Sequence, residues 1–254
     1  MKIYRFQHDR EILFGVLRET DLYPVEGSIF GDFEVGPKPV PIGDVTLLPP
    51  VEPSKIVGVG RNYREHSKEL GNPVPQEPLL FLKPPTAVIG PNGSILYPRS
   101  SRRVDYEGEL AVVIKREARN VGGAANPDDY ILGYTCINDV TARDLQSKDV
   151  QFTRSKSFDT FAPLGPCIAT GLEPSNLTVK TFLNGRLKQS SSTRHLIFPV
   201  AFLLSFISGI MTLCPGDIIA TGTPAGVGPM EPGDRVDVQI EGIGTLSNTV
   251  MHDG

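Results

Sequence analysis

Cysteine is scarce in this 254-residue chain, and its spacing matches no metal or redox motif. The sequence has three cysteines, Cys136, Cys167 and Cys214, and no Cys-x-x-Cys pair. An odd number without such spacing is typical of reduced thiols in a cytoplasmic protein. Residues 1–10 alternate polar and apolar side chains without an apolar core, so no secretory signal is expected. We therefore predict a cytoplasmic protein with small, buried, unpaired cysteines.

An excess of charge of one sign is also lacking. The chain has 25 Lys and Arg against 29 Asp and Glu, a formal net charge of −4. A nucleic-acid-binding protein needs a basic face, so no nucleic-acid partner is expected. Hydrophobic residues make up 39% and charged residues 21% of the sequence, which is typical of a soluble globular chain rather than a disordered one.

Long apolar runs are rare, and one stretch needs comment. Residues 196–215 carry no charge and approach the length of a membrane span, but they include Pro199 and Gly209. The flanking Arg194 and Asp217 give no charge asymmetry that would orient a span. A helix that is apolar all round can also lie inside a large protein or at a subunit interface. We therefore predict a buried helix here and no membrane partner.

Glycine and proline, by contrast, are abundant. The chain has 26 Gly and 23 Pro, together about a fifth of its residues against about an eighth on average. Both residues disfavour helix interiors, so the composition argues for short strands joined by turns and against a helical bundle. Six prolines between positions 37 and 53 predict a semi-rigid connector. We therefore divide the chain into residues 1–53, a small N-terminal β region with this connector, and residues 54–254, a larger domain.

The hydrophobic patterns predict an α+β, mainly β fold. Regular β-α-β alternation is lacking, which argues against a doubly wound sheet or a TIM barrel. Asn184-Gly185 between two apolar runs is the strongest hairpin signal. The predicted strands are 11–17, 55–59, 105–115, 129–138, 179–183, 186–189 and 236–240, with short helices at 63–70 and 139–147.

The strand at 105–115 carries the most informative chemistry. Side chains two positions apart in a strand point to one face, so Glu107 and Glu109 project together, with Asp105 sharing their parity. The strand continues as a purely apolar run, so this end should enter the core. Like charges side by side near a core cost several kcal/mol unless a cation offsets them. Gly108 between them allows another backbone or a ligand to approach closely.

Two carboxylates rarely complete a metal site, and Asp139 is the candidate third ligand. It follows the apolar segment 131–137, so it can lie at a neighbouring strand end. Ligation by oxygen atoms alone favours the hard ions Mg²⁺ or Mn²⁺, with Ca²⁺ possible next. Two alternatives stay open on these residues: a Glu-x-Glu pair is common on exposed edges, and Asp139 or Asn138 can simply cap the following helix.

Five segments together resemble the fumarylacetoacetate hydrolase family. Each segment alone is a weak signal, but five in the order and spacing of the family are highly specific. The resemblance covers about residues 55–250, and the first fifty residues look like the short N-terminal β region of many members. The segments are GVGRNYREHSKELG (58–71), YEGELAVVI (106–114), GYTCINDVTARDLQ (133–146), KSFDTFAPLGP (156–166) and MTLCPGDIIATGTPAGVG (211–228).

The resemblance implies a mixed β-sandwich roll that is usually a dimer or a multiple of one. It also implies that Glu107, Glu109 and Asp139 hold Mg²⁺ or Mn²⁺. Substrates of the family are 2-oxo or 2,4-dioxo carboxylates and their enols. Their reactions are hydrolysis of acylpyruvates, decarboxylation of oxaloacetate-like acids, and isomerisation of 2-hydroxy-dienoates in aromatic catabolism. We therefore expect a small-molecule 2-oxo acid as substrate and a homodimer.

The resemblance also assigns substrate contacts. Lys156 matches a lysine of the family site that would stand near the developing oxyanion; otherwise it would be an ordinary solvated lysine. Arg143 and Gln146, three positions apart on the short helix after Asp139, would contact the substrate rather than form a salt-bridged helix surface. Thr223, in the glycine-rich loop 221–228, would offer its hydroxyl and neighbouring amides to the substrate carboxylate.

His66 and Glu69 form the pair that decides the mechanism. Their i,i+3 spacing places them on one helical face, where the carboxylate can orient the imidazole or share a water with it. In hydrolytic members of the family this pair lies on a lid that activates water, and residues 71–75 would suit a mobile lid. The plain alternative is an exposed polar helical turn.

These observations predict a Mg²⁺- or Mn²⁺-dependent enzyme that cleaves a C–C bond in 2-oxo or 2,4-dioxo carboxylates. Acylpyruvate-type hydrolysis is preferred over oxaloacetate-type decarboxylation. One alternative is an isomerase of 2-hydroxy-diene-dioates. Another is a catalytically idle, metal-stabilised binding or scaffold protein.

Overall fold

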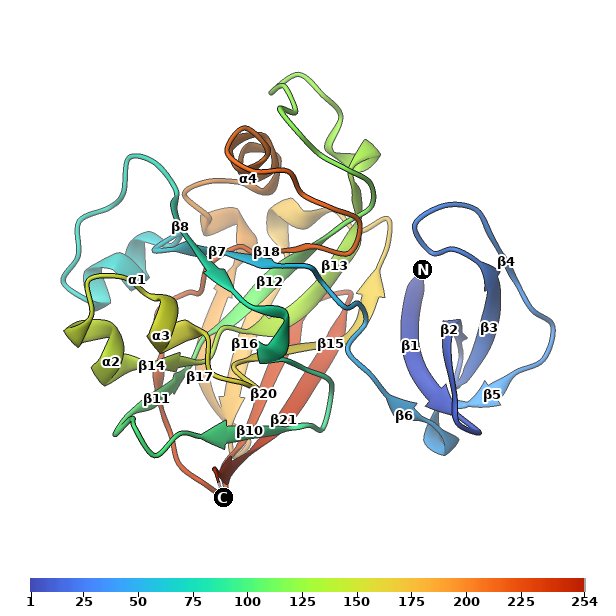
Figure 1. Cartoon of the computed structure of the whole chain (residues 1–254), viewed down its shortest axis with the longest axis horizontal. Coiled ribbons are helices and arrows are strands. Elements are labelled where there is room, and N and C mark those ends of the chain that lie inside the picture. The colour runs from blue at the N-terminus through green and yellow to red at the C-terminus, as the bar shows by residue number, and fades with distance from the viewer. Residues whose placement is uncertain (254) are drawn as a thin grey trace.

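The computed structural model describes residues 1–253, and most of its regular structure is β-strand, as the sequence predicts (Figure 1). Its largest sheet runs in the order β4-β3-β2-β1-β15-β13-β12-β18-β7-β8, with the short strands β5, β6 and β9 attached at its sides. Its strands are β1 (Lys2–His8), β2 (Glu11–Arg18), β3 (Asp21–Gly27), β4 (Phe33–Val35), β5 (Val40–Pro41), β6 (Thr46–Leu47), β7 (Ile56–Gly60), β8 (Leu79–Lys83), β9 (Val88–Ile89), β12 (Gly108–Ile114), β13 (Ile131–Asn138), β15 (Ala162–Ala169) and β18 (Ile218–Ala220).

Two smaller sheets complete the β structure. The five-stranded sheet has the order β10-β21-β20-β16-β17 and packs on β12, β13 and β15 of the large sheet, which makes the sandwich. The three-stranded sheet has the order β14-β11-β19. Their strands are β10 (Ser94–Tyr97), β21 (Gly244–His252), β20 (Arg235–Ile240), β16 (Thr178–Leu183), β17 (Arg186–Ser192), β14 (Thr141–Ala142), β11 (Val104–Tyr106) and β19 (Gly228–Met230).

The helices are few and short. The longest, α4, lies above the large sheet in Figure 1. No helix in residues 1–253 is long and apolar enough to cross a membrane. The α-helices are α1 (Arg64–Glu69), α2 (Arg143–Lys148), α3 (Thr153–Lys156) and α4 (Val200–Ser208), and the 3₁₀ helices are Ile42–Asp44, Pro85–Ala87, Pro127–Asp129, Pro174–Asn176 and Thr193–His195.

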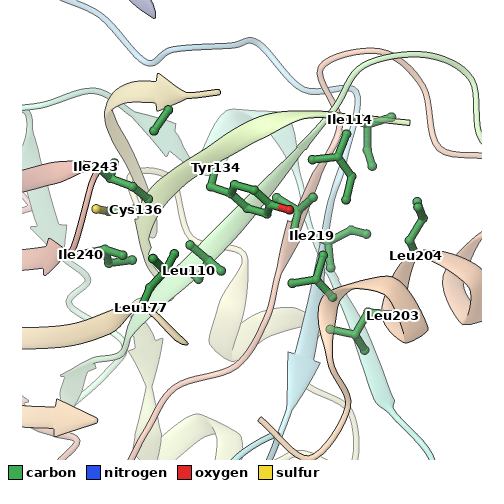
Figure 2. Packing of buried hydrophobic residues seen from close by; sticks show 14 of the residues in the cluster. Leu110, Ile114, Tyr134, Cys136, Leu177, Leu203, Leu204, Ile219, Ile240 and Ile243 are labelled. Carbon is green, nitrogen blue, oxygen red and sulfur yellow. The ribbon is translucent and has the colours of Figure 1, made fainter. Parts of the chain in front are cut away.

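The main core lies between the two large sheets and under α4. Figure 2 shows Leu110 of β12 facing Ile240 of the five-stranded sheet, while Leu203 of α4 covers Ile219 of β18. Alternation along β20 buries every second residue, as predicted from the sequence. The core therefore fixes the strand ends from which the polar residues of the next section project.

The N-terminal region adds strands to the same sheet. β1 pairs antiparallel with β15, so that Ile3 lies opposite Ile168. Side chains of the region also enter the core of the larger domain, since Ile3 and Val51 belong to one buried cluster with Ala111. The predicted proline-rich connector contains two short strands at the side of this sheet, a position that tolerates proline.

The structure corrects three sequence expectations. The strand predicted at 105–115 is interrupted at Glu107, where the chain passes from β11 of the small sheet to β12 of the large one. The apolar helix predicted within 196–215 is only α4, because Pro199 caps its start and Gly209 its end. The helical turns predicted from Asp139 begin only at Arg143, after the strand β14. The hairpin at Asn184-Gly185 is confirmed, with φ of +51° and +74°.

Candidate active site

A pocket of about 300 Å³ opens where β7 and β13 end and β12 begins. Its wall gathers segments that lie far apart in the sequence, from α1 to the loop after β18. Of the nine site residues predicted from the sequence, eight line it, and Glu69 does not. The lining residues are Val59, Gly60, Arg61, His66, Leu70, Asn72, Phe81, Glu107, Glu109, Asp139, Arg143, Gln146, Ser147, Phe152, Lys156 and Thr223.

Three carboxylates meet at the floor of the pocket. Glu107, Glu109 and Asp139 are all buried, and each offers an oxygen that lies within 4.8 Å of the others. The backbone fixes this arrangement. The amide of Glu107 donates to Oδ1 of Asn138 (2.9 Å), and the amide of Asp139 donates to the carbonyl of Glu107 (2.8 Å). The ends of two neighbouring strands are thereby locked together with their acidic side chains on one side.

Three cationic side chains surround this cluster. Lys156 forms ion pairs with Glu107 (2.9 Å) and Asp139. Arg143 pairs with Glu107 and, through Nε, with Asp105 (2.9 Å). Lys83 pairs with Asp139 and also donates to the carbonyl of Val140. Asp105 is therefore tied to arginine and stands outside the cluster, although it shares the strand parity of the two glutamates.

Lys83 is the residue that sequence reasoning missed. It has no exposed surface, and burial lowers the pKa of its ammonium, which Asp139 only partly offsets. The sequence held a weak signal, because this lysine ends the apolar strand β8 directly before two prolines. A lysine at a strand end is usually solvated, and its partner is 56 positions away, so the pairing needs the fold.

The charge balance within the cluster is uneven. Burial by itself would raise the pKa of Glu107, but the charges of Lys156 and Arg143 hold it well below its ordinary value. Burial and the negative charges of Asp139 and Glu107 raise the pKa of Glu109 well above its ordinary value. Glu109 accepts a hydrogen bond from the Gly222 amide (2.7 Å) and has no ion pair with any residue of 1–253.

The donor set fits a divalent cation. The carboxylate of Glu109 is buried beside two others and has no cationic side chain of its own, so a bound cation would offset its charge. Carboxylate oxygens are the ligands that Mg²⁺, Mn²⁺ and Ca²⁺ prefer. Glu107, Glu109 and Asp139 would hold such an ion. The two glutamates thus converge as predicted, although the strand from which this was predicted is interrupted at Glu107.

His66 and Glu69 also come together. The imidazole Nδ1 lies 3.2 Å from the Glu69 carboxylate, and the same carboxylate accepts the Gly226 amide at 3.0 Å. His66 is only 5% exposed, so α1 is not a solvated polar turn at this position. Since Nδ1 faces the carboxylate, Nε2 is left to act on a ligand or a water.

The three remaining predicted contacts, Arg143, Gln146 and Thr223, already make hydrogen bonds within the protein. Arg143 donates to the side-chain oxygen of Gln146, and its guanidinium is shared between Asp105 and Glu107. The hydroxyl of Thr223 donates to the carbonyl of Gly108 (3.0 Å). All three side chains line the pocket, but the hydroxyl proton of Thr223 is already donated to Gly108.

This β fold, with a pocket that holds three carboxylates, is shared with a known protein family. The family described as "Fumarylacetoacetate (FAA) hydrolase C-terminal" matches residues 55–251, and a second one, "Rv2993c-like, N-terminal", matches residues 1–50. The chain belongs to the fumarylacetoacetate hydrolase family.

Relatives of this chain differ in their activities. A 2-hydroxyhepta-2,4-diene-1,7-dioate isomerase from Mycobacterium marinum is 42% identical, with a TM-score of 0.93 over 100% of this chain and 99% of that one. The oxaloacetate tautomerase YisK of Bacillus subtilis is 41% identical over 85% of this chain and 77% of its own length. A maleylpyruvate hydrolase from Sphingobium sp. SYK-6, in complex with manganese(II) and pyruvate, is 29% identical, with a TM-score of 0.83 and full coverage of both chains.

Proposed function

We propose that this protein is a Mg²⁺- or Mn²⁺-dependent enzyme that acts on 2-oxo or 2,4-dioxo carboxylates, with acylpyruvate-type C–C hydrolysis as its preferred reaction. One observation carries the proposal: three buried carboxylates and a buried lysine converge in a single pocket. The manganese and pyruvate held by the Sphingobium relative support both the metal and the substrate class. Glu107, Glu109 and Asp139 are the proposed ligands.

These reactions share one physical problem, the negative charge that develops on the 2-oxo oxygen as an enolate forms. A divalent cation, when bound, supplies electrostatic stabilisation of that charge. Lys156 adds a second positive charge; Asp139 and Glu107 raise the pKa of its ammonium despite burial, so it stays protonated. Its Nζ is also 4.8 Å from the centre of the Phe81 ring, which restricts its position.

The substrate carboxylate would be bound opposite Lys156. Arg143 uses three of its five N–H groups within the protein, which leaves two for a ligand. Gln146 is held beside it and offers its amide N–H groups. Because the hydroxyl of Thr223 already donates to Gly108, backbone amides of its loop would make the contact there.

The pair His66 and Glu69 favours hydrolysis. Glu69 orients the imidazole through Nδ1, and Nε2 can take a proton from a water that attacks the distal carbonyl carbon of an acylpyruvate. The C–C bond then breaks and its electron pair leaves on the enolate of pyruvate. Oxaloacetate-type decarboxylation ends in the same enolate without an attacking water.

A second candidate is isomerisation or tautomerisation, in which the enolate is formed and protonated again without bond cleavage. The activities named for the Mycobacterium marinum and Bacillus subtilis relatives favour it. The third reading is a catalytically idle, metal-stabilised binding or scaffold protein. The convergence of all three carboxylates with Lys156 makes it the weakest of the three.

An assay with acetylpyruvate, oxaloacetate and a 2-hydroxy-muconate-type diene separates these readings. We expect Mn²⁺-dependent turnover of acetylpyruvate that is lost in Glu107→Ala and reduced about 10²–10⁴-fold in His66→Ala, with the exposed His195→Ala as the matched control. Isomerisation would instead survive His66→Ala. If none of the three substrates is turned over and Glu107→Ala changes no measured property of the protein, the scaffold reading remains. A melting temperature that responds to neither Mn²⁺ nor EDTA would exclude a bound metal in every reading.

We also propose that the protein is cytoplasmic and forms a homodimer. Three unpaired cysteines, two of them buried, support a reducing compartment. The homodimer rests on the family resemblance, and sedimentation equilibrium would test it.

A further inference from the structure

One cation in the pocket wall differs from the others. Arg143 and Lys156 are held in ion pairs with the carboxylate cluster, but Arg61 has no ion pair or side-chain hydrogen bond with any residue of 1–253. Arg61 is partly buried, so its charge is partly removed from water. A guanidinium offers five N–H donors in a planar fork that matches a carboxylate, and in this pocket none of them is used.

The backbone of Arg61 is also unusual. Its φ is +57°, the left-handed region that glycine adopts freely and arginine rarely does. The next residue fixes this conformation. Asn62 is fully buried; its Nδ2 donates to the carbonyls of Phe198 (3.0 Å) and Thr221 (2.8 Å), and its Oδ1 accepts from the Phe198 amide (2.8 Å). An arginine is therefore held in a strained conformation at the pocket wall, which is where strain points to function.

The sheet register gives the distance from Arg61 to the carboxylates. β18 pairs in parallel with β7 and antiparallel with β12, so Ala111, Ala220 and Gly58 form one row. Two positions along each strand from this row, Glu109 of β12 and Gly60 of β7 lie in line with each other. Their backbones are separated by two strand spacings of about 4.8 Å each, or roughly 10 Å. Arg61 follows Gly60 directly. Arg61 therefore lines the pocket from a backbone position roughly 10 Å from that of Glu109.

We propose that Arg61 binds the second carboxylate when the substrate is a 2-oxo diacid, and is therefore the residue that makes this site prefer diacids over monoacids. The inference rests on the proposed function, because the 2-oxo end must be held by a cation bound to Glu107, Glu109 and Asp139. Val59, Leu70 and Phe81 also line the pocket and would cover the carbon chain between the two ends. The volume of about 300 Å³ is sufficient for a short dicarboxylate.

Two probes of equal length isolate the second carboxylate: 2-oxoglutarate, which has it, and 2-oxopentanoate, which lacks it. Their dissociation constants would be measured by calorimetry with the full chain and Mn²⁺. Arg61→Gly removes the guanidinium and suits the positive φ, so its melting temperature should match that of the wild type; Arg61→Asn is a second variant that tolerates this backbone. Arg64→Ala, at an exposed arginine three residues away, is the matched control.

We expect wild type and Arg64→Ala to bind 2-oxoglutarate more tightly than 2-oxopentanoate. Arg61→Gly and Arg61→Asn should bind 2-oxoglutarate roughly ten- to a hundredfold more weakly, the effect of a lost charge-assisted hydrogen bond, with 2-oxopentanoate unchanged. Equal weakening of both probes, or a diacid preference that survives in both variants, overturns the role of Arg61. If acetylpyruvate is turned over while wild type shows no diacid preference, the inference alone is overturned. If wild type neither binds either probe nor turns over any 2-oxo acid, the proposed function falls with it.

Discussion

The backbone amide of Gly108 donates a hydrogen bond to the side-chain oxygen of Gln189, 3.0 Å away, across 81 positions of sequence. The amide group of the same glutamine donates to the hydroxyl of Thr223 and to the carbonyl of Pro224, both at 2.8 Å. One fully buried side chain from the second sheet therefore holds the residue between Glu107 and Glu109 and the loop facing it. Gln189 is a positioning residue for the carboxylate cluster.

Replacing Gln189 by leucine should loosen the cluster. Gln189→Leu leaves a buried amide without a partner, which costs about 1–3 kcal/mol of unfolding free energy. We expect that loss in urea denaturation, together with a smaller rise of melting temperature on adding Mn²⁺. Gln239→Leu, at an exposed position of β20, is the control and should change neither quantity. A Gln189→Leu protein with wild-type stability and metal response would contradict the positioning role.

Gly108 has no room for a side chain. A Cβ there would lie 2.1 Å from Oγ1 of Thr181, a short side chain that is itself buried. Gly108→Ala should therefore destabilise the protein by about 1–3 kcal/mol, the usual effect of overpacking. Adding Thr181→Ala should restore much of the loss, because Oγ1 of Thr181 has no hydrogen-bond partner within residues 1–253.

The double-mutant cycle for Gly108 and Thr181 would be measured by thermal unfolding. Gly122→Ala serves as the control, since nothing lies within 4 Å of a Cβ at that position. Additive effects of the two substitutions would show that the close contact is not the source of the strain.

Lys83 should matter although it does not line the pocket. Lys83→Met leaves Asp139 with Lys156 as its remaining cation. The free energy of unfolding should therefore fall by roughly 3 kcal/mol, the lower end of the range for a broken buried ion pair. Urea unfolding would measure it, with the exposed Lys188→Met expected within about 0.5 kcal/mol of wild type. A stable Lys83→Met protein would mean that the pair is dispensable for folding.

The three cysteines should differ in reactivity. Burial raises the pKa of Cys167 to about 11 and also raises that of the fully buried Cys136, so both stay protonated and inaccessible at neutral pH. Cys214 is partly exposed. Iodoacetamide followed by peptide mass mapping should find the label on Cys214 in the folded protein and on all three in urea. Labelling of Cys136 at the rate of Cys214 would contradict this packing.

The sequence could predict what depends on local geometry. Glu107 and Glu109 are two positions apart at the start of β12, so their convergence could be predicted from local spacing even though Glu107 itself precedes the strand. Asp139 joins them because it directly follows an apolar strand. The interruption at Glu107 could not be read locally, because it depends on pairing with two different sheets. The apolar stretch 196–215 predicts a helix, but it predicts neither the length of that helix nor the exposure of Phe202 and Ile210.

Lys83 and Arg61 lay outside what the sequence could reveal. The partner of Lys83 is 56 positions away, and the apolar strand before it is only a weak signal of burial. The positive φ of Arg61 depends on hydrogen bonds from Asn62 to residues 136 and 159 positions away. Arginine has no preference for that backbone conformation, so neither composition nor periodicity could have pointed to it.

The ion pairs around the cluster also affect how ligands bind together. Glu107 and Asp139 are already neutralised by Lys156, Arg143 and Lys83, so a divalent cation on the proposed ligands would leave the pocket with surplus positive charge. An anionic substrate would remove that surplus. The affinity of each would then be higher in the presence of the other, by the same factor in both directions. Metal and substrate would thus load cooperatively, and the pocket would retain its metal most strongly while a substrate is bound.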